Sequence, residues 1–199
     1  MISRPFVIAA TILLVATRAV HAQHAGSAPS DPTRAPSEAH QFDFLLGEWT
    51  VEAKPLVNSL AAKIHGVPKL VGTWRAWRAM DGWGLTDELR LLDASGNPRS
   101  VSHAVRVVEA NGQHWKQVTV DAFRGSVTQS DATWNGTAMQ VTGGGTDDNG
   151  KVFRSRIRFS EITPTSFTYR IDRSWDLGKT WSEGVLTITA KRSAAAATR

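Results

Sequence analysis

The chain has 199 residues, of which 41% are hydrophobic and 21% charged, with a formal net charge of +5 and no cysteine. That length accommodates one or at most two domains, and the apolar fraction is too high for a disordered chain. The absence of cysteine from the sequence excludes a disulfide scaffold, a thiolate zinc site and a cysteine nucleophile. Eight tryptophans against one tyrosine indicate an aromatic-rich core.

Residues 1–22 have the pattern of an export signal. A basic residue near the start precedes an apolar stretch over residues 6–16, and Val20 and Ala22 occupy the −3 and −1 positions of a small-residue cleavage site. A membrane anchor would need roughly 17–25 apolar residues, and a basic residue ends this run earlier. We therefore expect a mature chain that begins at Gln23 and lies in the periplasm or outside the cell.

Charge and hydropathy disfavour two classes of partner. Two of the 23 basic residues lie in the signal, so 21 remain against 18 acidic residues, a net charge of +3. A nucleic-acid-binding protein normally shows a concentrated basic stripe and is not exported, so no nucleic-acid partner is expected. No other segment is long and apolar enough to span a bilayer.

Composition divides the remaining chain into three parts. Residues 23–41 are rich in Ala, Ser and Pro and have no large apolar side chain, which predicts a flexible leader. Residues 193–199 contain four consecutive alanines and are expected to form a disordered tail. Residues 42–192 then form a single folded domain, large enough to bury about 70% of its unfolded surface.

Runs with period-two alternation, separated by turn signals, predict about ten strands within this domain. Such strands, joined by tight turns, pair antiparallel and must close or stack to hide their edges, which favours an up-and-down barrel over a two-sheet sandwich. The predicted strands cover residues 49–54, 70–80, 83–92, 101–108, 115–121, 128–134, 137–141, 152–162, 165–173 and 184–192.

Two segments depart from the strand pattern. Apolar residues at helical spacing over residues 56–64, bounded by Pro55 and Gly66, predict a short amphipathic helix between the first two strands. The triple glycine at 143–145 is expected to lie between strands. It is not a phosphate loop, because no Lys-Ser/Thr pair follows it.

An opening and a closing motif carry a family resemblance. Residues 42–51 read FDFLLGEWTV and residues 174–181 read SWDLGKTW. With these motifs the chain resembles a family of exported bacterial proteins that contain a domain of unknown function, over essentially residues 42–192. The resemblance implies a calycin-like barrel, similar to lipocalins and fatty-acid-binding proteins, without an established activity. The family often has glycine where this chain has Leu177.

The opening motif also resembles the lipocalin Gly-x-Trp signature, here Gly47-Glu48-Trp49. In lipocalins this Trp packs at the closed barrel end under an Arg from the last strand. The resemblance implies that Arg192 stacks on Trp49; the alternative is an independent core Trp and a solvated Arg.

The closing motif has the form of an Asp-box hairpin, which predicts a structural role. A short carboxylate at Asp176 can accept backbone N–H groups, Gly178 allows a positive φ, and Trp181 is expected to anchor the hairpin in the core. Ser174 and Thr180 complete the motif. A single copy cannot build the repeated blades of a propeller, which excludes a sialidase.

A pair of opposite charges falls on an apolar strand face beside Asp81-Gly82, a strong two-residue hairpin signal. Pairing across this turn places Arg78 and Asp87 diagonally adjacent, roughly 7–8 Å apart between backbones, which an Arg side chain spans. The alternative to a ligand site is a structural ion pair at the barrel rim. The candidate ligand-binding residues are Arg78, Asp87, Trp74, Trp83 and His103.

His103 enters this set because it alternates with Val101, Val105 and Val107, so it is expected on the apolar side of its strand. The alternative is a hydrogen-bonded core or lumen histidine. A haem ligand is disfavoured, because haem-binding barrels of this general shape use a His near the C-terminus and none follows His114.

No motif indicates catalysis or metal binding. The histidines lack the i, i+4 spacing of a zinc site, and serine nucleophile elbows and paired-carboxylate motifs are absent from the sequence. Arg154, Arg156 and Arg158 share a strand face opposite an apolar one, which predicts a solvated exterior row. We therefore expect no metal, no cofactor and no catalytic residue.

Three functions are compatible with this pattern. The first is a barrel that binds a small apolar or amphipathic molecule in its lumen, favoured by the tryptophan-rich interior and the helix after the first strand. The second is a filled barrel that acts through its surface as an envelope interaction module. The third is a small-molecule hydrolase or isomerase, which would need Asp87 or His103 in a cavity with a strongly shifted pKa. Fold alone does not choose among them.

Overall fold

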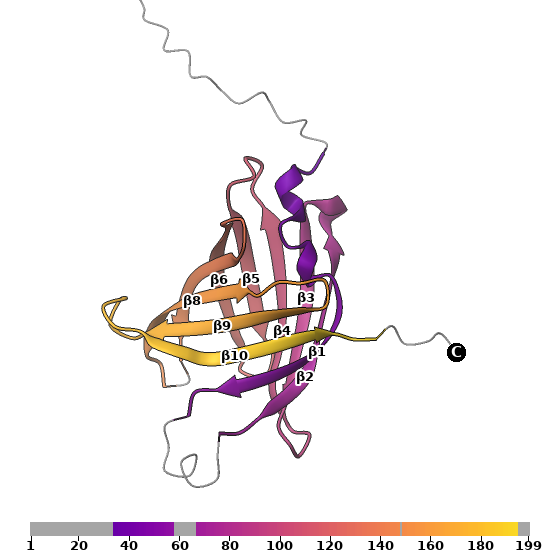
Figure 1. The fold of residues 1–199 in the computed structure, drawn as a ribbon. Coiled ribbons are helices and arrows are strands. Elements are labelled where there is room, and N and C mark those ends of the chain that lie inside the picture. The colour runs from indigo at the N-terminus through magenta and orange to yellow at the C-terminus, as the bar shows by residue number, and fades with distance from the viewer. Residues whose placement is uncertain (1–33, 58–66, 148, 195–199) are drawn as a thin grey trace, which may run out of the picture.

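A computed structural model describes residues 34–57, 67–147 and 149–194 (Figure 1). Ten strands form one closed barrel in which each strand pairs antiparallel with its neighbours in sequence, and β1 pairs with β10. This is the predicted up-and-down barrel. The strands are β1 (Gly47–Pro55), β2 (Leu70–Ala79), β3 (Gly84–Leu92), β4 (Pro98–Val108), β5 (Trp115–Asp121), β6 (Ser126–Trp134), β7 (Met139–Thr146), β8 (Val152–Ser160), β9 (Ser166–Ser174) and β10 (Ser182–Arg192).

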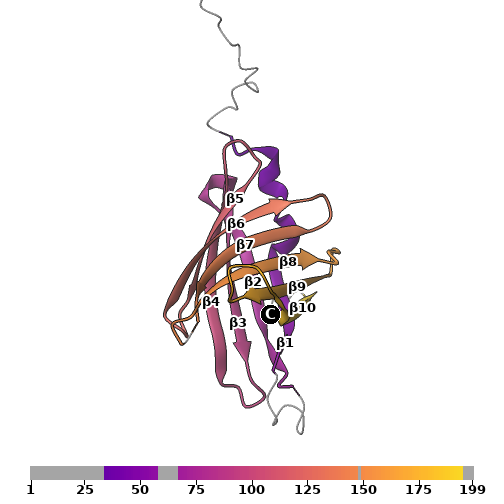
Figure 2. The ribbon, with the colours of Figure 1, turned by 90° about the vertical axis from the view of Figure 1, so that its left-hand side faces the viewer.

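The barrel has two unlike ends. Because successive strands alternate in direction, the β1–β2, β3–β4, β5–β6, β7–β8 and β9–β10 connections lie at one end, here called the open end. The other end holds the remaining connections and two short 3-10 helices, η1 (Ser37–His40) and η2 (Asp43–Leu45), which precede β1 (Figures 1 and 2). We call it the plugged end.

Residues 37–45, which include η1 and η2 and are here called the plug, are part of the core. Ala39, Phe42 and Leu45 are at most 1% exposed, and the Phe42 ring makes an edge contact with Trp115 at 4.9 Å between centroids. The Trp49 indole nitrogen donates to the Leu45 carbonyl at 2.8 Å. The folded unit thus begins before Phe42, so the last residues of the expected leader, 37–41, are ordered. Ala39 is the one apolar residue among them, which is why composition alone placed these residues outside the fold.

The first strand shows how sequence alternation builds the interior. Trp49, Val51 and Ala53 are fully buried, while the residues between them are exposed. The Arg192 guanidinium lies 4.1 Å from the Trp49 ring centroid, the stack expected from the Gly-x-Trp motif, and donates to the Leu46 carbonyl. A Cβ at Gly47, where φ is +102°, would lie 2.7 Å from that guanidinium, so glycine is required here.

The β2–β3 turn follows the prediction. Asp81 (φ 51°, ψ 33°) and Gly82 (φ +91°) adopt the left-handed conformations of a type I′ turn, within the short 3-10 segment η3 (Met80–Gly82). The register that results pairs Arg78 with Leu85 and Ala76 with Asp87.

Two local expectations have a different outcome. The triple glycine lies inside β7 and not between strands, because the absence of side chains lets neighbouring backbones approach: a Cβ at Gly144 would lie 2.6 Å from the Phe153 carbonyl oxygen. The helix expected over residues 56–64 falls, from residue 58 onward, outside the described residues, and Leu56 and Val57 are irregular. In the described ranges no helix has the length and hydropathy needed to cross a membrane.

Candidate functional site

A buried ion pair lies in the barrel interior. Asp87 of β3 and Arg106 of β4 are each 3% exposed, and Arg106 Nη1 contacts Asp87 Oδ2. The indole nitrogen of Trp74 donates to Asp87 Oδ1 at 2.7 Å, so this carboxylate is held from two neighbouring strands. Buried charges are tolerated when they are paired and hydrogen-bonded in this way.

Tyr169 and Arg173 of β9 lie near this ion pair. The inward-facing polar side chains of this part of the barrel are here called the polar layer; they are Trp74, Asp87, Arg106, Gln117, Tyr169 and Arg173. The Tyr169 ring packs between Trp74 and Phe159, with centroid distances of 5.2 and 4.9 Å. Burial raises the pKa of Tyr169 to about 12, against an opposing effect from the nearby Arg106 and Arg173 guanidinium groups. At neutral pH the phenol is therefore protonated and can donate a hydrogen bond.

Arg106 is charged at neutral pH. Burial lowers the pKa of Arg106 to about 10, partly offset by Tyr169, so the guanidinium remains positive at neutral pH. It also lies over the Phe42 ring at 5.2 Å, in contact with the plug. Arg106 of β4 and Arg173 of β9 both occupy inward-facing positions of their strands.

Two buried polar atoms of this layer have unused hydrogen-bonding capacity. Both atoms are buried. Within the described part of the chain, Arg106 Nε donates no hydrogen bond and Gln117 Oε1 accepts none. The Gln117 amide nitrogen, by contrast, donates to Thr119 Oγ1 at 3.0 Å. Buried polar groups are nearly always satisfied, so an unpaired donor beside an unpaired acceptor indicates room for a polar group or a water.

Toward the open end the interior changes character. Side chains that continue the inward-facing series become smaller and half-buried, which means that solvent reaches this part of the barrel wall. One side of the wall is apolar and the other carries hydroxyl groups. The apolar side comprises Leu70, Ile157, Ile171 and Leu186, and the polar side comprises Ser102, Thr119, Ser130 and Ser155.

Two hollows are present at the surface. One of about 220 Å³ lies at the open end, lined by Arg173 together with Lys151, Trp175, Asp176, Thr180 and Ser182. The other, of about 360 Å³, lies on the outer wall over β5–β7, lined by His114, Lys116, Asp131, Thr133, Gln140 and Thr142. Only the first contacts the polar layer, through Arg173.

Arg78 and Asp87 lie on the inner face as expected, but they do not pair with each other. Arg78 forms an ion pair with Asp43 of the plug and donates to the Ala39 carbonyl at 2.7 Å. Asp87 pairs instead with Arg106. The expected Arg78–Asp87 ion pair is therefore wrong, because the plug offers Arg78 a carboxylate that strand pairing alone does not reveal.

The remaining candidate residues divide between the two faces. Trp74 belongs to the polar layer, whereas Trp83 is half-buried beside the β2–β3 turn at the plugged end. His103 lies on the outer face, exposed, with its Nε2 2.7 Å from Thr86 Oγ1. Its expected inward orientation is wrong, because the valines that flank it also point outward.

Sequence reasoning missed Arg106, Gln117, Tyr169 and Arg173. On β4 both faces contain apolar residues, and the inward series Ala104, Arg106 and Val108 is less apolar than the outward valines. The signal that would have found Arg106 is its diagonal position relative to Asp87: Asp87 pairs with Ala104 on β4, and Arg106 lies two residues further along the same face. In the resolved ranges no group of three His, Asp or Glu side chains is placed to hold a metal ion.

Residues 174–181, the closing motif of the sequence, fold as a local hydrogen-bonded unit. Asp176 accepts the Thr180 N–H at 2.9 Å and the Thr180 hydroxyl at 2.6 Å, and Ser174 donates to it at 2.8 Å. These bonds lower the pKa of Asp176 to about 2. Gly178 has φ +96°, as the motif requires.

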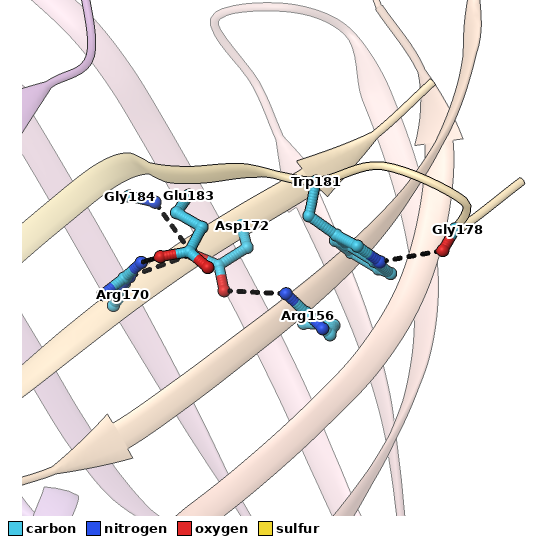
Figure 3. A network of polar contacts seen from close by, with 7 residues as sticks. All are labelled: Arg156, Arg170, Asp172, Gly178, Trp181, Glu183 and Gly184. Atoms are coloured by element: carbon cyan, nitrogen blue, oxygen red, sulfur yellow. Dashed lines mark hydrogen bonds and ion pairs between the residues drawn. The ribbon is translucent and has the colours of Figure 1, made fainter. Parts of the chain in front are cut away.

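Trp181 of this motif lies on the outer wall and not in the core, contrary to expectation (Figure 3). The Arg156 guanidinium covers its ring at 3.8 Å, and its indole nitrogen donates to the Gly178 carbonyl at 3.0 Å. Asp172 joins Arg156 to Arg170 and accepts the Gly184 N–H (Figure 3). The exterior arginine row on β8 thus exists, and it anchors the hairpin from outside.

Comparison with solved structures supports the fold. The crystal structure of Rv2717c from M. tuberculosis superposes with a TM-score of 0.59 at 13% sequence identity, covering 81% of this chain and all of that one. The S-type phycobiliprotein lyase CPES from Guillardia theta gives a TM-score of 0.54 at 10% identity, covering 80% and 97%. Both are similar to this chain in fold. No protein-family model and no curated protein sequence matches the chain.

Proposed function

We propose that this protein binds a small amphipathic molecule with an anionic group, which enters the barrel from its open end. The observation that carries the proposal is the unused hydrogen-bonding capacity of Arg106 Nε beside Gln117 Oε1, both buried in the interior. An ionised carboxylate oxygen would accept the hydrogen bond from Arg106 Nε, and a water bound beside it would donate to Gln117 Oε1.

Charge in the polar layer favours an anion. Arg106 Nη1 contacts Asp87 Oδ2, and the Nε–H of the same guanidinium remains to donate to a further acceptor. Arg173 adds a second positive charge, and the protonated Tyr169 phenol adds a donor. Charge-assisted hydrogen bonds of this kind are about twice as strong as neutral ones, so an anionic group is preferred to a neutral one here.

The wall toward the open end favours an amphipathic ligand. Leu70, Ile171 and Leu186 form an apolar strip that faces the hydroxyl groups of Ser102 and Thr119 across the interior. A molecule with an apolar body and polar edge would contact both. Ligand sites in small barrels combine such apolar walls with a few placed polar groups.

The comparisons fit this proposal without identifying the ligand. One barrel of the same fold is a phycobiliprotein lyase by its name, and at 10% identity the likeness carries the fold alone. Export to the periplasm and membership of the exported family belong to the proposal as well. They rest on residues 1–22, which lie outside the described ranges, and on the motifs at residues 42–51 and 174–181.

Titration with a fluorescent fatty acid and with the matching fatty alcohol tests the anion site. We expect saturable binding of the acid, about tenfold tighter than that of the alcohol, which corresponds to about 1.4 kcal/mol. Arg173→Met should reduce the affinity for the acid to that for the alcohol. The matched control Arg158→Met, on the outer wall of β8, should leave both affinities unchanged.

A filled barrel that acts through its outer surface is the competing function. The plugged half favours it, because Phe42, Trp115 and Phe159 occupy the interior there and the larger hollow lies outside. In that case neither probe binds saturably, and substitutions of the polar layer change stability alone.

A further inference from the structure

One part of the outer wall of the barrel is apolar. Large apolar side chains point outward there from β2, β4, β5 and β6, strands that lie on one side of the molecule (Figure 2). We call this surface the valine face; it comprises Trp77, Val101, Val105, Val107, Val118, Val120 and Val127. Four of these side chains, those of Trp77, Val118, Val120 and Val127, are 40–65% exposed.

The valine face is contiguous, because its members occupy neighbouring rows of the sheet. Trp77 of β2 pairs with Thr86 of β3. Thr86 also pairs with Val105 of β4, which in turn pairs with Val118 of β5. The row beside it consists of His103, Val120 and Val127, which pair in that order. Side chains that pair across a sheet have Cβ atoms about 5 Å apart, so the two rows form one surface.

The opposite part of the outer wall has a different composition. On β8 and β9 the outward residues after Val152 are Arg154, Arg156, Arg158, Ser160, Thr168, Arg170 and Asp172. A water-facing wall of this barrel is therefore built without large apolar side chains where nothing covers it. Single exposed apolar residues need no explanation, but a contiguous patch of several of them marks an interaction surface.

The size of the valine face fits an interface between two proteins. It extends from β2 to β6, about 19 Å at the spacing of neighbouring strands, and along β4 over residues 101–107, about 20 Å. This footprint of about 400 Å² grows to about 900 Å² when a rim one side chain wide is added. A standard interface buries about 800 Å² on each partner, with an apolar centre and a polar rim.

The charges around the valine face are paired within the chain. The ion pairs are Arg75–Glu48, Arg90–Glu88 and Lys116–Asp131. Lys116 also lies 3.5 Å from Glu109. The rim is therefore close to neutral and carries both signs. It gives a strongly acidic or basic partner no complementary field, and an identical rim meets it without net repulsion.

We propose that two copies of this chain associate through their valine faces, related by a two-fold axis. Such an axis presents the same surface from both copies, and an apolar face with a nearly neutral rim is complementary to itself. Side chains on the facing surfaces of two packed sheets interdigitate, as the β-branched valines of both copies would here. The valine face lies on the outer wall, so association does not depend on whether the lumen holds a ligand.

Sedimentation equilibrium of the purified protein tests the association. We expect a monomer–dimer equilibrium with a dissociation constant of about micromolar or lower, the range of interfaces of this size. Val118→Lys should raise that constant about a hundredfold or more, because it introduces a charge from each copy into the apolar centre. The matched control Thr189→Lys, also an outward β-branched position but on β10, should leave it unchanged.

A cysteine variant separates association from folding. The chain has no cysteine, so Val118→Cys provides a single thiol and should still dimerise. After the thiol is coupled to a bulky maleimide the protein should become monomeric with an unchanged circular dichroism spectrum, whereas Thr189→Cys coupled in the same way should remain a dimer.

Three results would overturn the proposal. The first is a monomer at all concentrations up to about 1 mM, the weak limit of measurable association. The second is a dimer that persists in both Val118→Lys and the coupled Val118→Cys protein, which would place the interface elsewhere. The third is a monomer that binds phosphatidylcholine vesicles and loses this binding in Val118→Lys, which would assign the valine face to a lipid surface.

Discussion

At the scale of single residues, Asp87 and Arg106 combine two roles in one buried pair. Their charges are held by Trp74 on one side and lie over the Phe42 ring on the other, so the pair connects β2, β3, β4 and the plug. A buried pair of this kind contributes little net stability, but loss of one partner leaves an uncompensated buried charge. Removal of one partner should therefore lower the free energy of unfolding far more than it would for an exposed ion pair.

Asp87→Leu alone should lower the free energy of unfolding by roughly 3–5 kcal/mol, since Arg106 is then a buried, unpaired cation. Asp87→Leu combined with Arg106→Met should restore most of that loss, because both charges are replaced by apolar groups of similar size. Urea denaturation of the three proteins measures the coupling. Additive losses would mean that the two charges do not interact in the folded protein.

At the scale of elements, four hairpins at the open end are each folded around an aspartate. Asp93 accepts the Ser95 and Asn97 N–H groups of the β3–β4 turn, and Asp121, Asp147 and Asp176 do the same in the next three hairpins. Hydrogen bonds from these N–H groups lower the pKa values of Asp93 and Asp147, and that of Asp176 falls to about 2.

The lowered pKa values predict a loss of stability in acid. The pKa of an unfolded Asp is about 3.9, above that of folded Asp176, so the contribution is present above pH 4 and is lost as the pH falls toward 2. The melting temperature should fall across this window. Asp176→Asn should melt lower than the unchanged protein at pH 7 and converge with it near pH 2; a constant difference would show that ionisation of Asp176 is not involved.

Turns and strands were predictable from the sequence because their determinants are local. Asp81-Gly82 specifies a type I′ turn by its backbone preferences, and alternation along β1 separates buried from exposed positions. The inward face of β4 was not predictable, because Val101, Val105 and Val107 make its outer face more apolar than its inner one. Alternation gives the period of a strand and leaves the choice of face to its neighbours.

The candidate site was predictable only in part, because it depends on contacts between distant segments. Trp74 and Asp87 share a hairpin, so their proximity follows from one turn. Arg106 and Tyr169 reach the same layer from strands that come together only when the barrel closes. The position of the plug is harder still to predict, since nothing in residues 37–45 specifies which strand ends they cover.

At the scale of the whole molecule, the barrel is a container with one closed and one accessible end. Arg78 ties the plug to β2, aromatic rings fill the plugged half, and the polar layer separates that half from the open end. We propose that this accessible half holds a small amphipathic anion.

Native mass spectrometry of the protein purified from its own host shows whether such a molecule is bound. We expect a small-molecule adduct on the unchanged protein, retained by the control Arg158→Met. The adduct should be lost or strongly reduced in Arg173→Met while the charge-state distribution stays that of a folded chain. A mass equal to the polypeptide alone in all three proteins, under conditions that preserve known non-covalent complexes, would contradict it.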